Sequence, residues 1–238
     1  MTRRRWIADR VSGNQAALTG DHANHLVRVL RARVGQEFDI VAGAVVRRGR
    51  IVNIADERVD FELGEEVSAG PSPPRVSLWL AIFKFDRMEW AIEKTTELGV
   101  SRIIPVIARR TDTHLASASV KRADRWKRIA LEASEQSRRA APPEIAAPVR
   151  SGQVVTSAAA LKIVLSESEN QTQLRDAVRE HKPEPEVELA VGPEGGWTAD
   201  EIELFHQEGW LSASLGPTVL RAETAAIAAI AITFSELG

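Results

Sequence analysis

Two glycine-containing loops near the C-terminus have the residue types and the spacing of a ligand-binding site. Residues 191–197 (VGPEGGW) and 215–225 (LGPTVLRAETA) each follow an apolar, strand-like run and lead into a helical segment. Glycine permits positive φ angles and lets the backbone approach a ligand closely, and the free N–H groups at the start of a helix favour a polar or anionic ligand. Ligands of open α/β sheets bind at the carboxyl ends of neighbouring strands, so the two loops predict one shared pocket.

Local helix signals accompany the loops. Thr198 and Glu201 have the spacing of a capping box, which predicts a helix directly after the first loop. An earlier helix is predicted to begin at Asp86, as its cap, and to end at Gly99, which supplies a left-handed stop. Taken alone, the glycine-rich loop could equally serve only to reverse the chain. Its assignment to a ligand site therefore depends on other segments of the sequence.

Three further segments carry a resemblance to a known family. They are residues 25–31 (HLVRVLR), 84–100 (KFDRMEWAIEKTTELGV) and 125–139 (RWKRIALEASEQSRR). Together with the two loops they resemble the SPOUT methyltransferases, and among these the RsmE family, which methylates N3 of a uridine in 16S ribosomal RNA. The resemblance covers about residues 6–234. It implies S-adenosyl-L-methionine as the cofactor, and 16S rRNA or the small ribosomal subunit as the partner.

The same resemblance implies which residues bind the ligands. In the related families the second loop closes over the adenosine part of the cofactor. Arg221 and Arg139 are the candidate catalytic residues, because a cationic donor would stabilise negative charge on the uracil oxygens as the N3 proton leaves. A structural bond from Arg221 to a loop carbonyl is an equal alternative. The expected cofactor-binding residues are Leu165, Gly192, Pro193, Glu194, Gly195, Gly196, Leu215, Gly216, Leu220, Arg221 and Thr224, and the expected RNA contacts are Arg3, Arg4, Arg28, Arg31, Lys84 and Arg87.

The chain contains no cysteine. This excludes disulfides, thiolate metal sites and a cysteine nucleophile. Methylation of C5 of a pyrimidine usually proceeds through attack by a thiolate on the ring, whereas methylation of a nitrogen or a ribose oxygen needs only deprotonation and in-line transfer. A ribose 2′-O-methyltransferase is therefore the nearest alternative to the N3 enzyme. A non-catalytic RNA-binding protein of ribosome assembly is the second alternative.

Charges are segregated along the chain, although the net charge is only −2. Residues 1–50 carry 10 Lys and Arg against 4 Asp and Glu, whereas residues 151–238 carry 5 against 14. Clustered basic side chains suit contacts with phosphates, and an acidic surface repels a polyanion. The segregation therefore favours RNA binding through the first part of the chain.

Residues 69–74 (AGPSPP) divide the chain, because glycine and proline interrupt the periodicity there. Before this linker, short alternating runs predict a small β-rich domain with one helix around residues 21–30; the resemblance implies a PUA-like RNA-binding β-barrel over residues 1–70. After it, strand-like runs alternate with helical segments, as in an α/β parallel sheet. The resemblance implies a SPOUT methyltransferase domain with a trefoil knot over residues 75–238, so the predicted fold class is α/β with a small N-terminal barrel.

Several classes of protein are excluded or disfavoured. No apolar run reaches the ~18 residues of a membrane span, and the basic start of the chain lacks the apolar stretch of a secretion signal, so we expect a cytoplasmic protein. The five histidines show no grouping with metal-ligand spacing, and no metal is expected. Neither a GxGxxG nor a GxxxxGK[ST] motif occurs, which argues against a Rossmann dinucleotide site or a P-loop.

Two positions depart from the RsmE pattern. Thr218 stands where similar sequences commonly have arginine, and Arg138 where they commonly have glycine. Cofactor binding is expected to survive both changes, whereas the two departures limit what the resemblance implies about contacts with the substrate. Because SPOUT enzymes pair so that two subunits form each active site, a homodimer is also expected. The apolar segment 225–234 is a candidate for that contact, and burial within one subunit explains its composition equally well.

Overall fold

The computed structural model describes residues 5–43, 45–67, 74–137, 139, 141–153, 161–181 and 186–237. The chain divides into two compact units, Met1–Ser72 and Pro73–Gly238. Residues 69–73 of the expected linker (69–74) lie outside the described residues. Each unit has its own apolar core.

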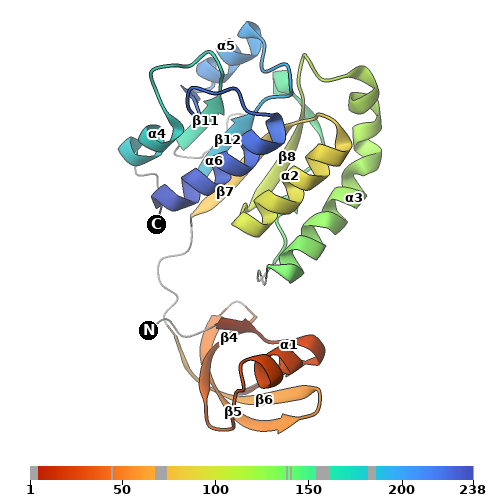
Figure 1. Ribbon diagram of the computed structural model, residues 1–238, viewed down its shortest axis with the longest axis vertical. Helices are drawn as coiled ribbons and strands as arrows, with labels where there is room; N and C mark the ends of the chain where they lie inside the picture. Colours follow the sequence, from red (N-terminus) through yellow and green to blue (C-terminus); the bar gives the residue numbers. More distant parts are fainter. Residues whose placement is uncertain are drawn as a thin grey trace. The chain divides into compact units, whose positions relative to one another are not determined.

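The first unit is a six-stranded sheet with one helical segment (Figure 1). In chain order its elements are β1 (Arg5–Ile7), β2 (Arg10–Ser12), β3 (Gln15–Thr19), α1 (Gly20–Asn24), the π-helical turn η1 (His25–Val29), β4 (Glu37–Ala42), β5 (Val45–Ala55) and β6 (Arg58–Glu66). The strands are arranged in the order β1-β4-β5-β6-β3-β2, and the only parallel pair among them is β1 with β4. The single helix expected around residues 21–30 is thus an α-helical turn followed by a π-helical one.

The core of the first unit lies between the sheet and this helical segment. Leu18, Ile40 and Phe61 from three strands and Leu26 from η1 are fully buried in it. A Cβ atom at Gly49 would lie only 2.4 Å from Cγ1 of Ile40. Glycine is therefore required for β5 to pass this close to the core, at the point where its pairing with β6 shifts register.

The second unit contains a parallel sheet with helices between its strands. Its elements are β7 (Arg75–Ala81), α2 (Phe85–Leu98), β8 (Arg102–Ile107), α3 (Thr113–Gln136), β9 (Glu144–Ile145), β10 (Val149–Arg150), the 3₁₀ turn η2 (Ser151–Gln153), β11 (Leu161–Leu165), α4 (Leu174–His181), β12 (Glu186–Val191), α5 (Ala199–Gln207), β13 (Leu211–Ala213) and α6 (Ala222–Leu237). The order is β10-β8-β7-β12-β11-β13, with β9 also paired to β8, and every pair is parallel. None of the described helices is long and apolar enough to cross a membrane.

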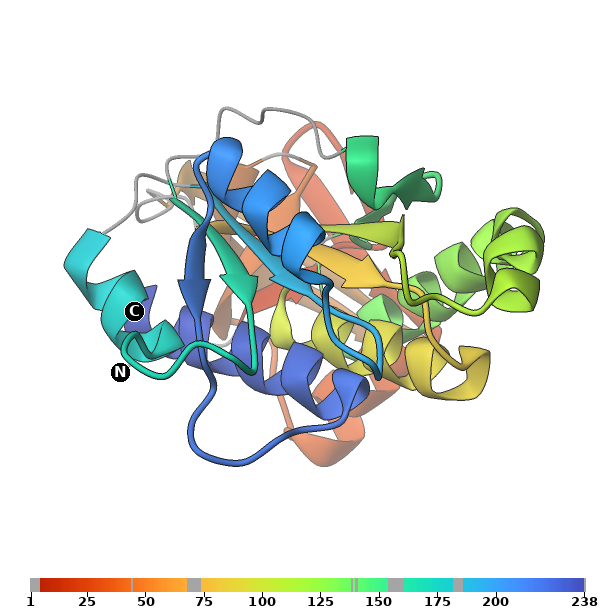
Figure 2. The ribbon, with the colours of Figure 1, turned by 90° about the horizontal axis from the view of Figure 1, so that it is seen from above.

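Helices cover both faces of this sheet, which explains why its central strands are apolar on both sides. The larger core lies under α2, α3, α4 and α6. The opposite face carries α5 and an aromatic cluster of Trp79, Trp197, Phe205 and Trp210. Figure 2 shows α5 on one side of the sheet and α2 and α6 on the other. Because β12, β11 and β13 are neighbours and pair in parallel, their carboxyl ends lie together at one edge of the sheet.

Candidate active site

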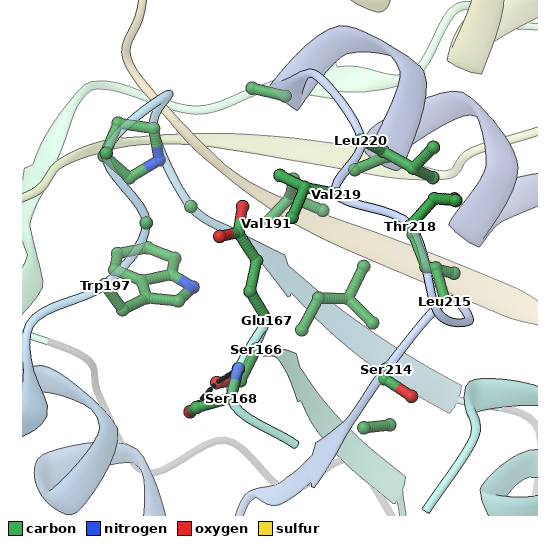
Figure 3. Close-up of a pocket in the computed structure, with 18 of the residues that line it drawn as sticks. Ser166, Glu167, Ser168, Val191, Trp197, Ser214, Leu215, Thr218, Val219 and Leu220 are labelled. Carbon is green, nitrogen blue, oxygen red and sulfur yellow. Dashed lines mark hydrogen bonds between the residues drawn. The ribbon is translucent and has the colours of Figure 1, made fainter. Parts of the chain in front are cut away.

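A pocket of about 290 Å³ lies at the carboxyl ends of β11, β12 and β13 (Figure 3). Three loops, one after each strand, form most of its lining, and Arg110 from the loop after β8 and the first turn of α6 complete it. Its lining residues are Arg110, Leu165, Ser166, Glu167, Ser168, Val191, Gly192, Pro193, Gly195, Gly196, Trp197, Ala213, Ser214, Leu215, Gly216, Pro217, Thr218, Val219, Leu220, Ala222 and Ala225. The sequence predicted two of these loops. The third, residues 166–168, was missed.

Most of the expected cofactor residues lie in this pocket. Those in its lining are Leu165, Gly192, Pro193, Gly195, Gly196, Leu215, Gly216 and Leu220. The other three, Glu194, Arg221 and Thr224, are exposed and are not in the lining. Arg221 nevertheless stands in the chain between two lining residues, Leu220 and Ala222, so it lies at the margin of the pocket.

The loop glycines adopt conformations that other residues disfavour. Gly196 has φ = 67° and Gly216 has φ = 121°, which are strained for residues with a side chain. No atom lies within 4 Å of the position that a Cβ would take at either glycine. Backbone conformation, rather than crowding, therefore requires glycine at both positions.

The glycine-rich loop is held from two sides. The guanidinium of Arg110, on the loop after β8, donates a hydrogen bond to the carbonyl oxygen of Gly195. The backbone N–H of the neighbouring Arg109 donates to Oε1 of Glu201 at 2.8 Å. Glu201 and Thr198 form the predicted capping box at the start of α5. These bonds connect the loop after β12 to the loop after β8, although the two are about 85 residues apart in sequence.

Glu201 is almost completely buried, and its charge is stabilised by hydrogen bonds. Burial by itself raises the pKa of its carboxyl. The backbone N–H groups of Thr198 and Arg109, with the hydroxyls of Ser151 and Thr198, outweigh that effect and hold the pKa below its usual range. The carboxylate form of Glu201 thus fixes the position of the loop that carries Gly195 and Gly196.

Arg139, expected to be catalytic, lies away from the pocket. Its guanidinium donates hydrogen bonds to the carbonyl oxygens of Thr96 and Val100, at 2.6 and 2.7 Å. Burial lowers the pKa of Arg139. Because α2 runs from the carboxyl end of β7 to the start of β8, its C-terminal end is at the opposite edge of the sheet from the pocket. Within one chain this geometry gives Arg139 a structural role, and its catalytic role stays an untested prediction.

The expected RNA contacts fall into three groups. Arg28 and Arg31 are exposed on the first unit, and Arg31 has an unusual positive φ of 52°. Lys84 is exposed just before α2. Arg87 is half-buried, and its Nε lies 3.8 Å from Oε1 of the buried Glu223 in the first turn of α6. Arg3 and Arg4, like Arg138, lie outside the described residues.

Trp197 contributes an unpaired donor to the pocket wall. Its ring packs edge-on against Phe205, with centroids 5.0 Å apart, and the residue is only 8% exposed. Nε1 of the indole has no hydrogen-bond partner among the described residues. The pocket combines this donor with glycine backbone, an apolar wall and the charged side chains of Arg110 and Glu167. A polar ligand of the size and character of S-adenosyl-L-methionine fits such a pocket. Within the described part of the chain, no group of His, Asp and Glu side chains could hold a metal ion.

Comparisons with known proteins give the same result for both units. The RNA methyltransferase domain family matches residues 70–233, and the RNA methyltransferase PUA domain family matches residues 18–64. Ribosomal RNA small subunit methyltransferase E of Synechocystis is 35% identical over 219 residues, which are 90% of this chain and 71% of that protein. The protein of the same name from Rickettsia conorii is 32% identical over 230 residues, covering 95% and 92% of the two chains.

A solved structure extends the comparison to the cofactor. Ribosomal RNA small subunit methyltransferase E from Neisseria gonorrhoeae, bound to S-adenosyl methionine, superposes with a TM-score of 0.64 at 29% identity and covers 95% of this chain and 94% of that one. The predicted α/β fold of SPOUT type with a PUA-like first domain is confirmed, and so is S-adenosyl-L-methionine as the cofactor. Fold, pocket and sequence thus agree that the chain belongs to the RNA methyltransferase family that includes ribosomal RNA small subunit methyltransferase E.

Proposed function

We propose that this protein transfers the methyl group of S-adenosyl-L-methionine to N3 of a uridine in 16S ribosomal RNA. The observation that carries the proposal is the three-loop pocket at the carboxyl edge of the parallel sheet, in a chain that matches the methyltransferase family over residues 70–233. Both relatives compared above are named as methyltransferases of the small-subunit ribosomal RNA. The absence of cysteine supports methylation of a nitrogen, which needs no covalent intermediate with the enzyme.

The chemistry requires two contributions from the protein. The cofactor supplies a methyl group that its sulfonium already activates. The protein must hold the uracil N3 in line with that methyl group and must stabilise the negative charge that spreads over the uracil oxygens as the N3 proton leaves. A uridine turned out of its stack would reach the pocket edge.

Arg221 is our candidate for stabilising that charge. It is exposed at the margin of the pocket, and among the described residues no hydrogen bond or ion pair occupies its guanidinium. A guanidinium keeps its charge at all physiological pH values and presents several donors in a fixed plane. Arg221 is therefore available to the two oxygens that flank N3 of uracil.

We assign RNA binding to the first unit, where Arg28 and Arg31 are exposed. The basic excess of residues 1–50 supports this assignment. Thr218 lies exposed in the pocket lining. There it would leave room for the substrate where similar sequences commonly carry arginine.

We also propose that two copies of the chain associate through α6. One face of this helix, with the spacing i, i+3, i+4, i+7, i+11, consists of exposed or half-exposed residues: Thr224, Ile227, Ala228, Ala231 and Ser235. Between Ala222 and Leu237 the only charged residues are Glu223 and Glu236. A surface stripe without charge is typical of subunit contacts. Sedimentation that shows only monomers at micromolar concentrations would contradict this assembly.

The test of the reaction is to identify the product. Purified protein, labelled S-adenosyl-L-methionine and small ribosomal subunits from a strain that lacks this methylation are incubated together. The nucleosides are separated by chromatography and identified by their fragmentation in the mass spectrometer, which shows whether the methyl group is on the base or on the ribose. We expect N3-methyluridine. Recovery of a 2′-O-methylated nucleoside would establish the ribose alternative, and cofactor binding without methyl transfer to subunits or to naked RNA would favour a non-catalytic RNA-binding protein.

A further inference from the structure

Two side chains of the pocket have hydrogen-bonding capacity that the described residues leave unused. The indole Nε1 of Trp197 is buried without a partner. The carboxylate of Glu167, on the loop after β11, lines the same pocket and makes no hydrogen bond or ion pair within the described part of the chain. In Figure 3 the nitrogen edge of the Trp197 ring is turned toward the interior of the pocket, and the Glu167 side chain extends into that interior from the adjoining loop.

A buried N–H without a partner is costly. Leaving such a donor unsatisfied costs on the order of 1–3 kcal/mol, and each case in a folded protein calls for an explanation. Trp210 belongs to the same aromatic cluster and also has an unpaired Nε1, but it is absent from the pocket lining. Trp197 alone of these two can give its hydrogen bond to a molecule in the pocket.

The two groups have opposite capacities. An indole nitrogen only donates, and an ionised carboxylate only accepts. In S-adenosyl-L-methionine a donor stands beside an acceptor at the amino-acid end, at the edge of the adenine and at the ribose, so the choice among them depends on the rest of the pocket. A hydroxyl both donates and accepts. The ribose carries two of them on neighbouring carbons, which matches a donor and an acceptor that face one space.

The distribution of apolar residues favours the ribose as the part of the cofactor that lies between Trp197 and Glu167. Val191, Leu215 and Leu220 line the pocket, and Figure 3 shows Leu215 and Leu220 on the side opposite Trp197. A flat adenine ring loses most contact with water when it packs against such aliphatic side chains. The ribose would then lie toward the polar side, where Trp197, Glu167 and Ser166 are found.

We propose that Trp197 and Glu167 bind the ribose hydroxyls of the cofactor: the indole N–H donates to one hydroxyl oxygen, and the carboxylate of Glu167 accepts a hydrogen bond from a hydroxyl. Trp197 ends the first predicted loop but was not among the expected cofactor-binding residues, and Glu167 lies on the loop that was not predicted. The inference rests on the assignment of the pocket to S-adenosyl-L-methionine. Beyond that assignment, it states which part of the cofactor the two side chains bind.

The test is a set of double-mutant cycles between protein and ligand, measured by calorimetry. The ligands are S-adenosylhomocysteine and its 2′-deoxy and 3′-deoxy forms, and the variants are Glu167→Gln and Trp197→Phe. In the wild type, loss of a contacted hydroxyl should weaken binding about tenfold or more. In the variant whose side chain can no longer bond to that hydroxyl, removal of the hydroxyl should weaken binding less than about threefold, because the contact is already absent. Trp210→Phe and the exposed Glu203→Gln are the matched controls, and both should keep the sensitivity of the wild type.

A second measurement follows the N–H group directly. In protein labelled with ¹⁵N at tryptophan, the indole proton of Trp197 should move downfield when S-adenosylhomocysteine binds, and Trp197→Phe identifies its signal. An indole signal that stays in place, or an equal loss of affinity for the deoxy ligands in every variant, would overturn the assignment. If the variants instead changed the affinity for a ligand with 7-deaza-adenine in place of adenine, the two side chains would contact the base, and the assignment to the ribose would also be overturned. Failure of the wild type to bind S-adenosylhomocysteine would refute the cofactor pocket itself.

Discussion

Arg139 binds a backbone carbonyl group at the C-terminal end of α2: its Nη1 atom donates a 2.6 Å hydrogen bond to the carbonyl oxygen of Thr96. The last carbonyl groups of a helix have no partner within the helix. A second bond, to the carbonyl of Val100, ties the start of the following segment to the same guanidinium. These two bonds connect the segment after α3 to the end of α2. They lie at the edge of the sheet opposite the pocket.

Replacement of this arginine separates a structural role from a catalytic one. Arg139→Ala should lower the free energy of unfolding by roughly 2 kcal/mol, because two hydrogen bonds from a charged donor are lost. Single-turnover methyl transfer by the folded fraction should be unchanged. Urea unfolding and rapid-quench kinetics measure the two quantities. A large loss of rate without loss of stability would return Arg139 to the catalytic site.

Replacement of Gly196 tests the conformation of the pocket loop. Gly196→Val should abolish measurable binding of S-adenosyl-L-methionine, because a β-branched residue disfavours the φ of 67° and would redirect the loop. Gly13 has a similar φ of 57° and equally open surroundings in the first unit. Gly13→Val is therefore the matched control and should bind the cofactor normally. Calorimetry with circular dichroism decides, and undiminished affinity in folded Gly196→Val would remove the pocket assignment.

Arg221 should act on the rate rather than on cofactor binding. Arg221→Ala should bind S-adenosyl-L-methionine with nearly unchanged affinity, since the residue is exposed beside the pocket lining. Loss of a donor to charge that develops in the transition state typically costs ~10²–10³ in rate. The assay is single-turnover methyl transfer at saturating cofactor and RNA. An unchanged rate constant in that assay would exclude the proposed role.

Arg28 and Arg31 should contribute to RNA affinity without contributing to cofactor affinity. The double variant Arg28→Gln, Arg31→Gln should bind RNA more weakly. The slope of log affinity against log salt should flatten by about 0.7 for each phosphate contact that is lost. Arg175→Gln, an exposed arginine in the acidic part of the chain, serves as the control. RNA titrations at several salt concentrations measure this, and equal slopes would place the RNA site elsewhere.

The buried carboxylate of Glu201 makes stability depend on pH in the acidic range. Because its pKa is lower in the folded protein than the ordinary 4.5, its stabilisation is complete above that value and is lost as the pH falls through the folded pKa. Glu201→Gln should be less stable than the wild type at neutral pH, and the difference should shrink below pH 4.5. Urea unfolding over this range is the measurement. A difference that stays constant with pH would contradict a stabilising charge.

The parts of the site that could be predicted from the sequence are those that local chemistry determines. Gly196 and Gly216 adopt the positive φ angles that their loops required, and Thr198 and Glu201 form the expected capping box. In each case the sequence pattern that predicts the feature spans only a few neighbouring residues. By contrast, the hydrogen bond from Arg110 to Gly195 joins loops that only the folded sheet brings together.

Other expectations were overruled by packing. The helix expected to begin at Asp86 begins at Phe85, with Lys84 as its cap and no hydrogen bond from a capping side chain. Phe85 packs against Trp126 and under the guanidinium of Arg122, so long-range contacts favour its inclusion in the helix. The loop at residues 166–168 has no glycine, and its hydroxyl and carboxyl side chains look like those of any exposed turn. Only their position after β11 places them in the pocket.

Helix α6 joins the cofactor pocket to the proposed subunit contact. Ala222 and Ala225 in its first turn line the cofactor pocket, and the uncharged stripe along the rest of the helix is the proposed subunit contact. A helix that contacts two ligands is able to couple their binding, and any such coupling is reciprocal. If cofactor binding raises the affinity between subunits, then pairing raises the affinity for the cofactor by the same factor. The concentration at which the protein pairs would then report how much S-adenosyl-L-methionine is present.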